Sequence, residues 1–142
     1  MVVSGLKKDI NLLSDDLNNK KVKNLKLNVS APFHCKYMKT ASEKMTSHIN
    51  DLNMNDLEKP IISNVTANET SSSREIKSLL ISQIEKKVRW LESVEYMINN
   101  GVKNFVEIGP GKVLSGLIKR INKNVNVNSI NTEEDIKLLI ND

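Results

Sequence analysis

The amino-acid sequence predicts an α/β fold from three observations. In several segments apolar residues recur at every third or fourth position, which is the spacing of amphipathic helices. Between those segments lie short runs with alternating or continuous apolar residues, which is typical of strands. Turn-forming residues separate the two kinds of segment, and strands that alternate with helices build a sheet covered by helices. A hydrophobic content of 39% with 27% charged residues is ordinary for a globular domain and argues against a disordered chain.

The first thirty residues predict a strand, a helix and a second strand. Val2 and Val3 are interpreted as the end of a strand that turns at residues 4–5. Residues 6–17 have apolar side chains at helical spacing, so they predict an amphipathic helix. In residues 22–29, valine and leucine alternate with lysine and asparagine, which is the period-two pattern of a half-buried strand.

The next segments predict a loop, a helix and a strand. Pro32 favours an extended backbone at the residue before it, so residues 30–35 are expected to form a loop. Residues 37–52 have the spacing of a helix. The short apolar run at residues 60–65 predicts a strand, and the polar, breaker-rich residues 66–73 predict a flexible loop.

The following segments predict two successive helices and a strand. Ser73 is a candidate N-cap for a helix that reaches residue 84, and a second helix over residues 88–98 should stop at Asn100 and Gly101. Residues 105–108 are a run that predicts a buried strand.

The C-terminal segments continue the alternation. Residues 109–111, Gly-Pro-Gly, form a turn into a helix over residues 113–121. A last short strand is expected near residues 125–127. A terminal helix should begin at residue 132, because the acidic residues that follow suit the positive end of the helix dipole.

The charge distribution argues against a nucleic-acid-binding protein. The formal net charge is +4, but 18 of the 21 basic residues are lysines, spread along the chain among acidic residues. Aromatic residues, which would stack on bases, make up only 4%. Scattered lysine is typical of a solvated surface, so we expect no nucleic-acid partner.

Other features predict a cytoplasmic chain without a metal site. No apolar run reaches the roughly 18 residues of a membrane span, and residues 1–5 are too short for a signal-peptide core. We therefore expect no membrane partner. The single cysteine, Cys35, cannot form an internal disulfide and excludes zinc sites built on paired cysteines.

Three positions invite a chemical interpretation. His34 follows a predicted strand, where α/β folds place catalytic groups; it is either a general base or a histidine held by backbone atoms. Cys35 next to it is interpreted as a small packing residue rather than a nucleophile. Residues 109–112 look like a phosphate loop, but Pro110 has no N–H to offer, so a tight turn is favoured.

Three segments together resemble one family. Residues 29–38, 88–97 and 107–117 match the bacterial malonyl-CoA:acyl-carrier-protein transacylases of fatty-acid synthesis in composition, order and interval. The resemblance implies that residues 30–142 are the C-terminal part of an α/β hydrolase-like acyltransferase domain. It implies that residues 1–29 are part of a ferredoxin-like small subdomain.

The resemblance also implies a two-step acyl transfer with malonyl-CoA and the phosphopantetheine thiol of acyl carrier protein as substrates, and no cofactor. The family's general base falls on His34, and the glutamine whose carbonyl accepts a hydrogen bond from that imidazole falls on Gln83. Phe33 matches the aromatic residue found beside the base in malonyl-selective enzymes, where it would bind substrate; packing in a core is its alternative role.

The resemblance places the nucleophilic serine, the arginine that binds the malonyl carboxylate and an oxyanion-hole glutamine upstream of this sequence. We therefore expect a C-terminal half whose serine comes from a separate N-terminal acyltransferase fragment or a longer gene product. The alternative is a non-catalytic remnant or a carrier-protein-binding module. In either case, strand edges and apolar faces that the other half would cover should be exposed.

Overall fold

The computed structural model describes the backbone of residues 2–141 and the side chains of residues 2–138. The fold is α/β, as the sequence predicts. Contacts divide the chain into two compact units, Met1–Arg89 and Trp90–Asp142. The predicted boundary at residues 29/30 concerns the two subdomains of the family and stays a prediction. Within the described residues, no helix has the length and apolar character that crossing a membrane requires.

The first unit begins with helix α1 (Lys7–Asn19), close to its predicted bounds. The predicted strand at residues 2–3 is wrong, because these residues are irregular. The predicted strand at residues 22–29 is also wrong. These residues run beside α1, where the Ser14 hydroxyl donates to Asn24 Oδ1 at 2.8 Å, but no strand among the described residues pairs with them. Leu25 is 86% exposed.

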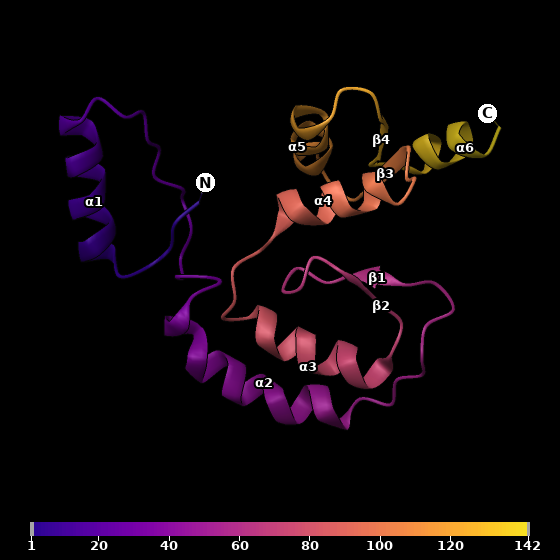
Figure 1. Ribbon diagram of the computed structural model, residues 1–142, viewed down its shortest axis with the longest axis horizontal. Coiled ribbons are helices and arrows are strands. Elements are labelled where there is room, and N and C mark those ends of the chain that lie inside the picture. The colour runs from indigo at the N-terminus through magenta and orange to yellow at the C-terminus, as the bar shows by residue number, and fades with distance from the viewer. Residues whose placement is uncertain (1, 142) are drawn as a thin grey trace. The chain divides into compact units, whose positions relative to one another are not determined.

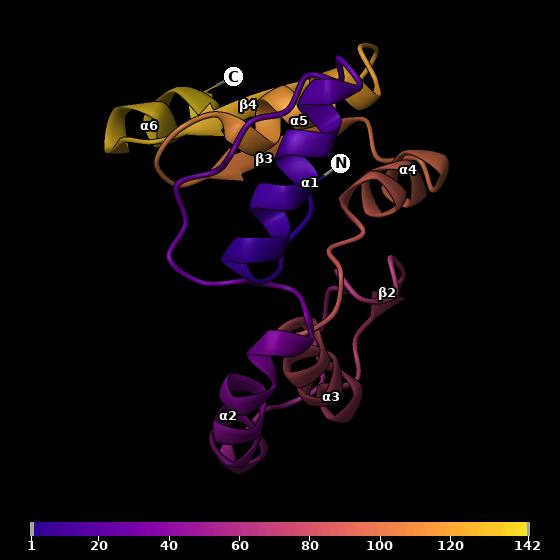
Figure 2. The same cartoon turned by 90° about the vertical axis from the view of Figure 1, so that its left-hand side faces the viewer.

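Two helices form the main body of the first unit (Figure 1). The predicted loop at residues 30–35 is present and leads through a 3₁₀ helix, η1 (Lys36–Met38), into α2 (Lys39–Asp51). Helix α2 packs against α3 (Ser73–Gln83), and the two lie side by side in both ribbon views (Figures 1 and 2). Ile49 of α2 and Ile76 of α3 are both buried.

A small hairpin precedes α3. Strand β1 (Ile61–Ile62) pairs antiparallel with β2 (Glu69–Thr70), so the strand predicted at 60–65 is shorter and the loop predicted at 66–73 is partly ordered. The loop is ordered because buried Ala67 donates its N–H to the Ser63 carbonyl at 2.8 Å. Ser72, not Ser73, caps α3, since its hydroxyl accepts from the Glu75 N–H.

The second unit is a βαβ motif flanked by two helices. Helix α4 (Trp90–Asn99) leads to β3 (Asn104–Ile108), and α5 (Val113–Ile121) connects β3 to the parallel strand β4 (Asn126–Ile130). Helix α6 (Glu133–Asn141) follows. The register aligns Phe105 with Val127. The core of this unit consists of Val94, Ile118 and Val125, with Trp90, Met97, Ile98, Phe105, Ile121 and Val127 packed around it.

The prediction that residues 105–108 form a buried strand is wrong in part. One side of β3 is partly covered, with Phe105 in contact with the core and Glu107 bonded to α5. On the other side, Val106 is 43% exposed and Ile108 is 79% exposed. Side chains of a strand alternate between its two faces, so the sheet of this unit is covered on one face and open on the other at β3.

Candidate functional site

His34 lies in the loop between the extended segment 22–29 and η1, within the first unit. Its φ of 59° is in the left-handed region, where non-glycine residues are uncommon. The loop is held by a hydrogen bond from the Phe33 N–H to the Ala31 carbonyl at 3.0 Å and by the Ser4 hydroxyl, which donates to the Phe33 carbonyl at 2.5 Å. These bonds hold the backbone that directly precedes His34.

The imidazole of His34 reaches the end of α3. Its Nδ1 lies 2.9 Å from the main-chain carbonyl oxygen of Gln83. Gln83 is the last residue of α3, and the final carbonyls of a helix have no partner within it. A carbonyl oxygen only accepts, so this hydrogen bond requires the proton on Nδ1. In the neutral ring Nε2 is then unprotonated and able to accept a proton.

This contact joins two of the residues singled out from the sequence. The oxygen involved belongs to the Gln83 main chain, so the bond does not depend on the glutamine side chain. His34 is exposed, which leaves its ring accessible to a reacting group. The catalytic roles of His34 and Gln83 stay predictions.

Phe33 and Cys35 flank the histidine. Phe33 is 49% exposed, so its ring is not a core residue of the first unit. Its role in substrate binding stays a prediction. Cys35 is partly buried, and its thiol donates to the Pro32 carbonyl at 3.1 Å, which tightens the loop. This bond supports the structural interpretation of Cys35.

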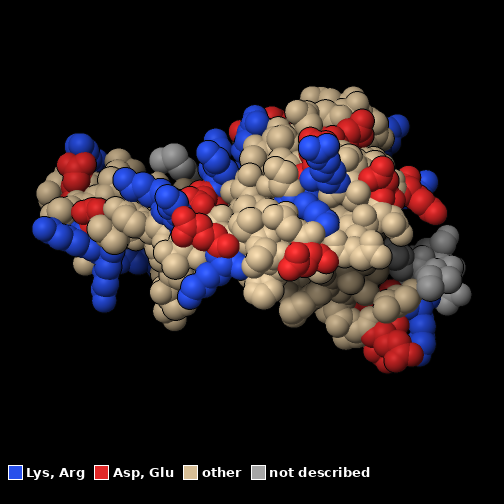
Figure 3. Space-filling model, turned by 90° about the horizontal axis from the view of Figure 1, so that it is seen from below, with Lys and Arg blue, Asp and Glu red and all other residues tan. Residues whose placement is uncertain are grey.

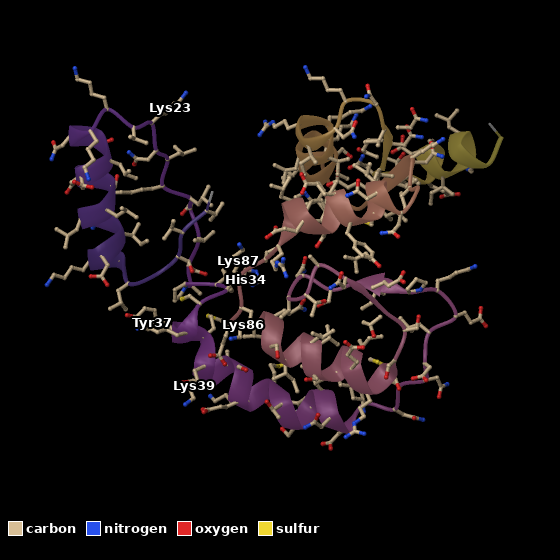
Figure 4. The ribbon with its side chains drawn as sticks, viewed as in Figure 1. Lys23, His34, Tyr37, Lys39, Lys86 and Lys87 are labelled. Atoms are coloured by element: carbon tan, nitrogen blue, oxygen red, sulfur yellow. The ribbon has the colours of Figure 1, made fainter. Side chains whose placement is uncertain are left out.

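A depression of about 300 Å³ opens on the first unit, between the segment that follows His34 and the end of α3. It is lined by Lys36, Ser42, Ile81, Ser82, Glu85 and Lys86. Lys36 stands two residues after His34, and its ammonium lies 5.5 Å from the centre of the Tyr37 ring. Lys86 stands three residues after Gln83. Figure 4 shows His34, Tyr37, Lys39 and Lys86 in this region.

The lining is basic on balance, with two lysines and one glutamate. Some lysines outside it are paired with an acidic residue, for example Lys39 with Glu43 at 3.7 Å. On the face shown in Figure 3, basic and acidic side chains are mixed. The lysines are scattered along the sequence, and their pattern does not predict that η1 and the end of α3 bring Lys36 and Lys86 into one lining. The sequence contains one signal for this arrangement. Lys36 stands two residues after His34, and Lys86 stands three residues after Gln83.

The glycine-rich turn after β3 has a structural role. Gly109 and Gly111 have φ values of 136° and 99°, which other residues rarely adopt. The Glu107 carboxylate accepts the N–H groups of Leu114 at 3.0 Å and Ser115 at 2.7 Å, near the start of α5. A phosphate would need these same donors, so the geometry supports a tight turn rather than a phosphate loop.

Hydrogen bonds from Ser115 lower the pKa of Glu107. The bond from the Ser115 side chain has the larger effect, and the bond from the Ser115 backbone N–H has the smaller one. The carboxylate is therefore the favoured form in this turn. Among the residues that the structure describes, no group of three or more His, Cys, Asp or Glu side chains is placed to hold a metal ion.

Sequence comparison gives close relatives, although no family model matches the chain. A malonyl CoA-acyl carrier protein transacylase of Staphylococcus aureus (strain MSSA476) is 43% identical over 140 residues, which are 96% of this chain and 45% of the relative. The enzyme of the same name from Bacillus subtilis (strain 168) is 39% identical over 141 residues, 99% of this chain and 44% of the relative.

Solved structures agree with the sequence relatives. An acyl-carrier-protein S-malonyltransferase from Bartonella henselae superimposes with a TM-score of 0.88 at 36% identity, over 94% of this chain and 43% of that chain. A malonyl-transacylase solved in complex with a type II polyketide synthase acyl-carrier protein gives a TM-score of 0.88 at 33% identity, over 97% and 45% of the two chains.

The chain has the α/β fold of one part of the solved S-malonyltransferases. The chain belongs with the malonyl CoA-acyl carrier protein transacylases, whose length it spans by about 45%. That share is what a C-terminal portion, as indicated by the order of the motifs, would cover.

Proposed function

We propose that this chain supplies the general base for malonyl transfer from malonyl-CoA to the phosphopantetheine thiol of acyl carrier protein. The observation that carries the proposal is the contact of His34 Nδ1 with the Gln83 carbonyl oxygen at 2.9 Å. That bond leaves Nε2 able to accept a proton, which a general base requires. The names of the relatives supply the donor and the acceptor.

In the proposed mechanism, the nucleophile is a serine on a complementary segment of the acyltransferase fold. Its hydroxyl oxygen attacks the thioester carbonyl while His34 Nε2 takes the proton. The carbonyl re-forms, the C–S bond breaks and the proton returns to the leaving CoA sulfur. The phosphopantetheine thiol then attacks the seryl ester, and His34 removes the thiol proton and gives it back to the serine oxygen. The Gln83 carbonyl holds Nδ1–H throughout, as the third group of a triad does.

Two further features of this unit suit the proposed substrates. Phe33 is half exposed beside the base, where its ring would contact the acyl group and exclude bulkier ones. Lys36 and Lys86 would attract the phosphates of CoA and of phosphopantetheine. The proposed reaction needs no cofactor beyond these substrates, and its cytoplasmic location stays a prediction.

A second candidate function is a carrier-protein-binding module without catalysis. The basic lining of the depression favours it, because attraction to a phosphate needs neither a nucleophile nor a base. The two candidates differ in whether His34 matters, since a module that only binds does not require proton transfer.

The direct test is to co-express this chain with the N-terminal part of the S. aureus relative that lies outside the matched region. Radiolabelled malonyl transfer to holo acyl carrier protein is then measured. His34→Ala should lower kcat by about 10²- to 10⁴-fold, the contribution of general acid–base catalysis. His48→Ala is the matched control, because His48 is also exposed but lies in α2; it should retain activity.

Two results would contradict the proposal. One is a stable malonyl adduct on this chain alone, seen by intact mass spectrometry, because the serine would then not be missing. The other is equal activity in His34→Ala and wild type. A folded pair that binds holo carrier protein but transfers no malonyl group would favour the binding module instead.

The contribution of the lysines is tested by the double variant Lys36→Glu/Lys86→Glu. Because rim charges act mainly on association, kcat/KM for malonyl-CoA should fall several-fold at low salt, and the difference should shrink at high salt. Lys44→Glu, an exposed lysine of α2 outside the depression, should leave kcat/KM unchanged. Equal effects of the two variants would show that only the total charge matters.

A further inference from the structure

Ser4 bonds to the His34 loop from outside that loop. It stands three residues before the start of α1, and its hydroxyl donates to the Phe33 carbonyl oxygen at 2.5 Å. The two residues are 29 positions apart in the sequence. The bond therefore ties the N-terminal segment of the first unit to the main chain directly before the histidine.

The backbone of His34 is in an uncommon conformation. Its φ of 59° lies in the left-handed region, which costs free energy for a residue that has a Cβ. Such a residue keeps this conformation only where its surroundings hold it there. The contacts made by the loop must therefore offset the cost at His34.

The Phe33 carbonyl belongs to the peptide unit that joins Phe33 to His34. The atoms of a peptide unit are coplanar, so a bond that holds this oxygen also holds the orientation of the His34 N–H. Residues 33–34 form a turn. Turns of types I and II differ mainly in the orientation of their central peptide unit, and of the two only type II requires a positive φ at the following residue. Rotation of this peptide unit would therefore return His34 to a negative φ and turn the carbonyl away from Ser4.

The bonds within the loop do not oppose that rotation in the same way. The Phe33 N–H donates to the Ala31 carbonyl at 3.0 Å, and the Cys35 thiol donates to the Pro32 carbonyl at 3.1 Å. Neither bond involves an atom of the rotating peptide unit. The Ser4 hydroxyl does bond to that unit, so it favours one of its two orientations.

The orientation of this peptide unit affects the imidazole of His34. Rotation of the unit moves the His34 nitrogen and tilts the Cα–Cβ bond, and the ring nitrogens move farther than Cβ because they lie at the end of the side chain. Nδ1 is 2.9 Å from the Gln83 carbonyl oxygen, and a hydrogen bond is lost when the two atoms separate beyond the usual range.

We propose that Ser4 is a positioning residue for His34. Its hydroxyl holds the peptide unit before His34 in the orientation that keeps Nδ1 on the Gln83 carbonyl. The proposal rests on the proposed function only for the catalytic role of His34.

Nitrogen-15 NMR of the imidazole tests the proposal on the chain itself. The chain has two histidines, so a His48→Ala background leaves the signals of His34 alone. At a pH where the ring is neutral, Nδ1 should be protonated, as its bond to a carbonyl requires. Ser4→Ala should lower the ratio of this tautomer to the other by about 2- to 10-fold, which is the contribution of a typical hydrogen bond. Ser4→Thr keeps a hydroxyl and should restore the ratio.

The scalar coupling between the amide and α protons of His34 reports its φ. This coupling should change in Ser4→Ala and return to the wild-type value in Ser4→Thr. Ser47→Ala is the matched control, because Ser47 is also exposed and its hydroxyl also donates to a main-chain carbonyl, that of Lys44 in α2 at 3.5 Å. It should leave both the coupling and the tautomer ratio unchanged. Far-UV circular dichroism shows that each variant keeps its helices.

Malonyl transfer by the co-expressed pair gives the functional measurement. Ser4→Ala should lower kcat by about 2- to 10-fold and leave KM for malonyl-CoA unchanged, because only the geometry of the base changes. In a His34→Ala background the same substitution should cause no further loss, since its effect acts through His34. A role of Ser4 in stability alone would lower activity in both backgrounds and would contradict the proposal.

The proposal is overturned if Ser4→Ala leaves the His34 tautomer ratio and coupling as in wild type, if Ser4→Thr does not restore them, or if Ser47→Ala changes them equally. These outcomes are separable from the test of the proposed function. NMR signals of His34 that depend on Ser4, in a pair that transfers no malonyl group, would refute the proposed function and leave the positioning role intact. Transfer that depends on His34, with NMR signals that do not respond to Ser4→Ala, would do the reverse.

Discussion

Residues 22–29 in the first unit and residues 104–108 in the second are both short stretches rich in valine, leucine or isoleucine. Only the second stretch forms a strand. Strand β3 has β4 as a parallel partner, and α5 connects the two strands within the same unit. Residues 22–29 have α1 beside them but no strand, and Leu25 stays 86% exposed.

The difference shows what an alternating pattern does and does not determine. Alternation selects which side chains would share a face, but a strand exists only when another strand accepts its backbone hydrogen bonds. A helix satisfies its own backbone, which explains why the predicted helices form even where neighbouring strands do not. The two stretches therefore differ in whether a partner strand is present, and not in their propensity to form a strand. Three predictions test that statement.

The largest effect is expected from the core that supports β3 and β4. Val94 is 0% exposed and belongs to that core, so Val94→Ala should lower the free energy of unfolding of the second unit by about 2 kcal/mol. Val29→Ala makes the same chemical change at a 62% exposed position of the first unit, and it should lower the free energy of unfolding of that unit by less than about 0.5 kcal/mol. Urea unfolding followed by the fluorescence of Trp90, which packs against the core, measures the effect of Val94→Ala. Urea unfolding followed by far-UV circular dichroism measures the effect of Val29→Ala.

A similar loss in the two valine variants would contradict the comparison, because it would mean that residues 22–29 are as well packed as the core. Val94→Thr, which keeps the shape but adds a hydroxyl, should be destabilising as well, because the core around Val94 is apolar and would bury the hydroxyl without a hydrogen-bond partner. Far-UV circular dichroism shows whether each variant keeps its helices.

A smaller effect is expected from pH at Glu107, which ties β3 to the start of α5. The folded-state pKa of Glu107 is lowered mainly by the hydrogen bond from the Ser115 side chain, and to a smaller extent by the bond from the Ser115 N–H. Its carboxylate therefore stabilises the fold above its ordinary pKa, and this contribution is lost as the pH falls through the lower folded-state pKa. The melting temperature of Glu107→Gln should depend less on pH across that acidic range than that of wild type. Parallel curves for the two proteins would contradict the role of this carboxylate.

Most helices of the fold could be predicted, because each shows apolar residues at a spacing of three to four. The strands were predicted less well for physical reasons. Residues 60–65 contain only a two-residue strand, and its partner Glu69–Thr70 lies in a stretch without an apolar pattern. The order in that hairpin comes from backbone hydrogen bonds around Ala67, which side-chain periodicity does not encode.

The candidate site was predicted in part. His34 and Gln83 were singled out through the family motif, and their contact at 2.9 Å is present. The left-handed backbone of His34 and the hydroxyl of Ser4 on the Phe33 carbonyl were not predicted, because they depend on how the loop closes. The pairing of Lys36 with Lys86 in one depression was also missed, since it requires the packing of η1 and α2 near the end of α3.

The smallest effect on the isolated chain is expected at Leu25, and it sharpens the comparison most. Because Leu25 is 86% exposed, Leu25→Lys should change the stability of the chain alone by no more than about 0.5 kcal/mol. In the complex with the complementary acyltransferase part, Leu25 should lie on the covered face of a strand, where a charge is costly. The variant should therefore weaken that complex several-fold, while Asn28→Ala, at an exposed position on the opposite face of the stretch, should not. Titration calorimetry with the complementary acyltransferase part measures the difference. If Leu25→Lys lowers neither the stability of the chain nor the affinity of the complex, residues 22–29 do not form a strand in the complex. Their alternation would then have no structural consequence.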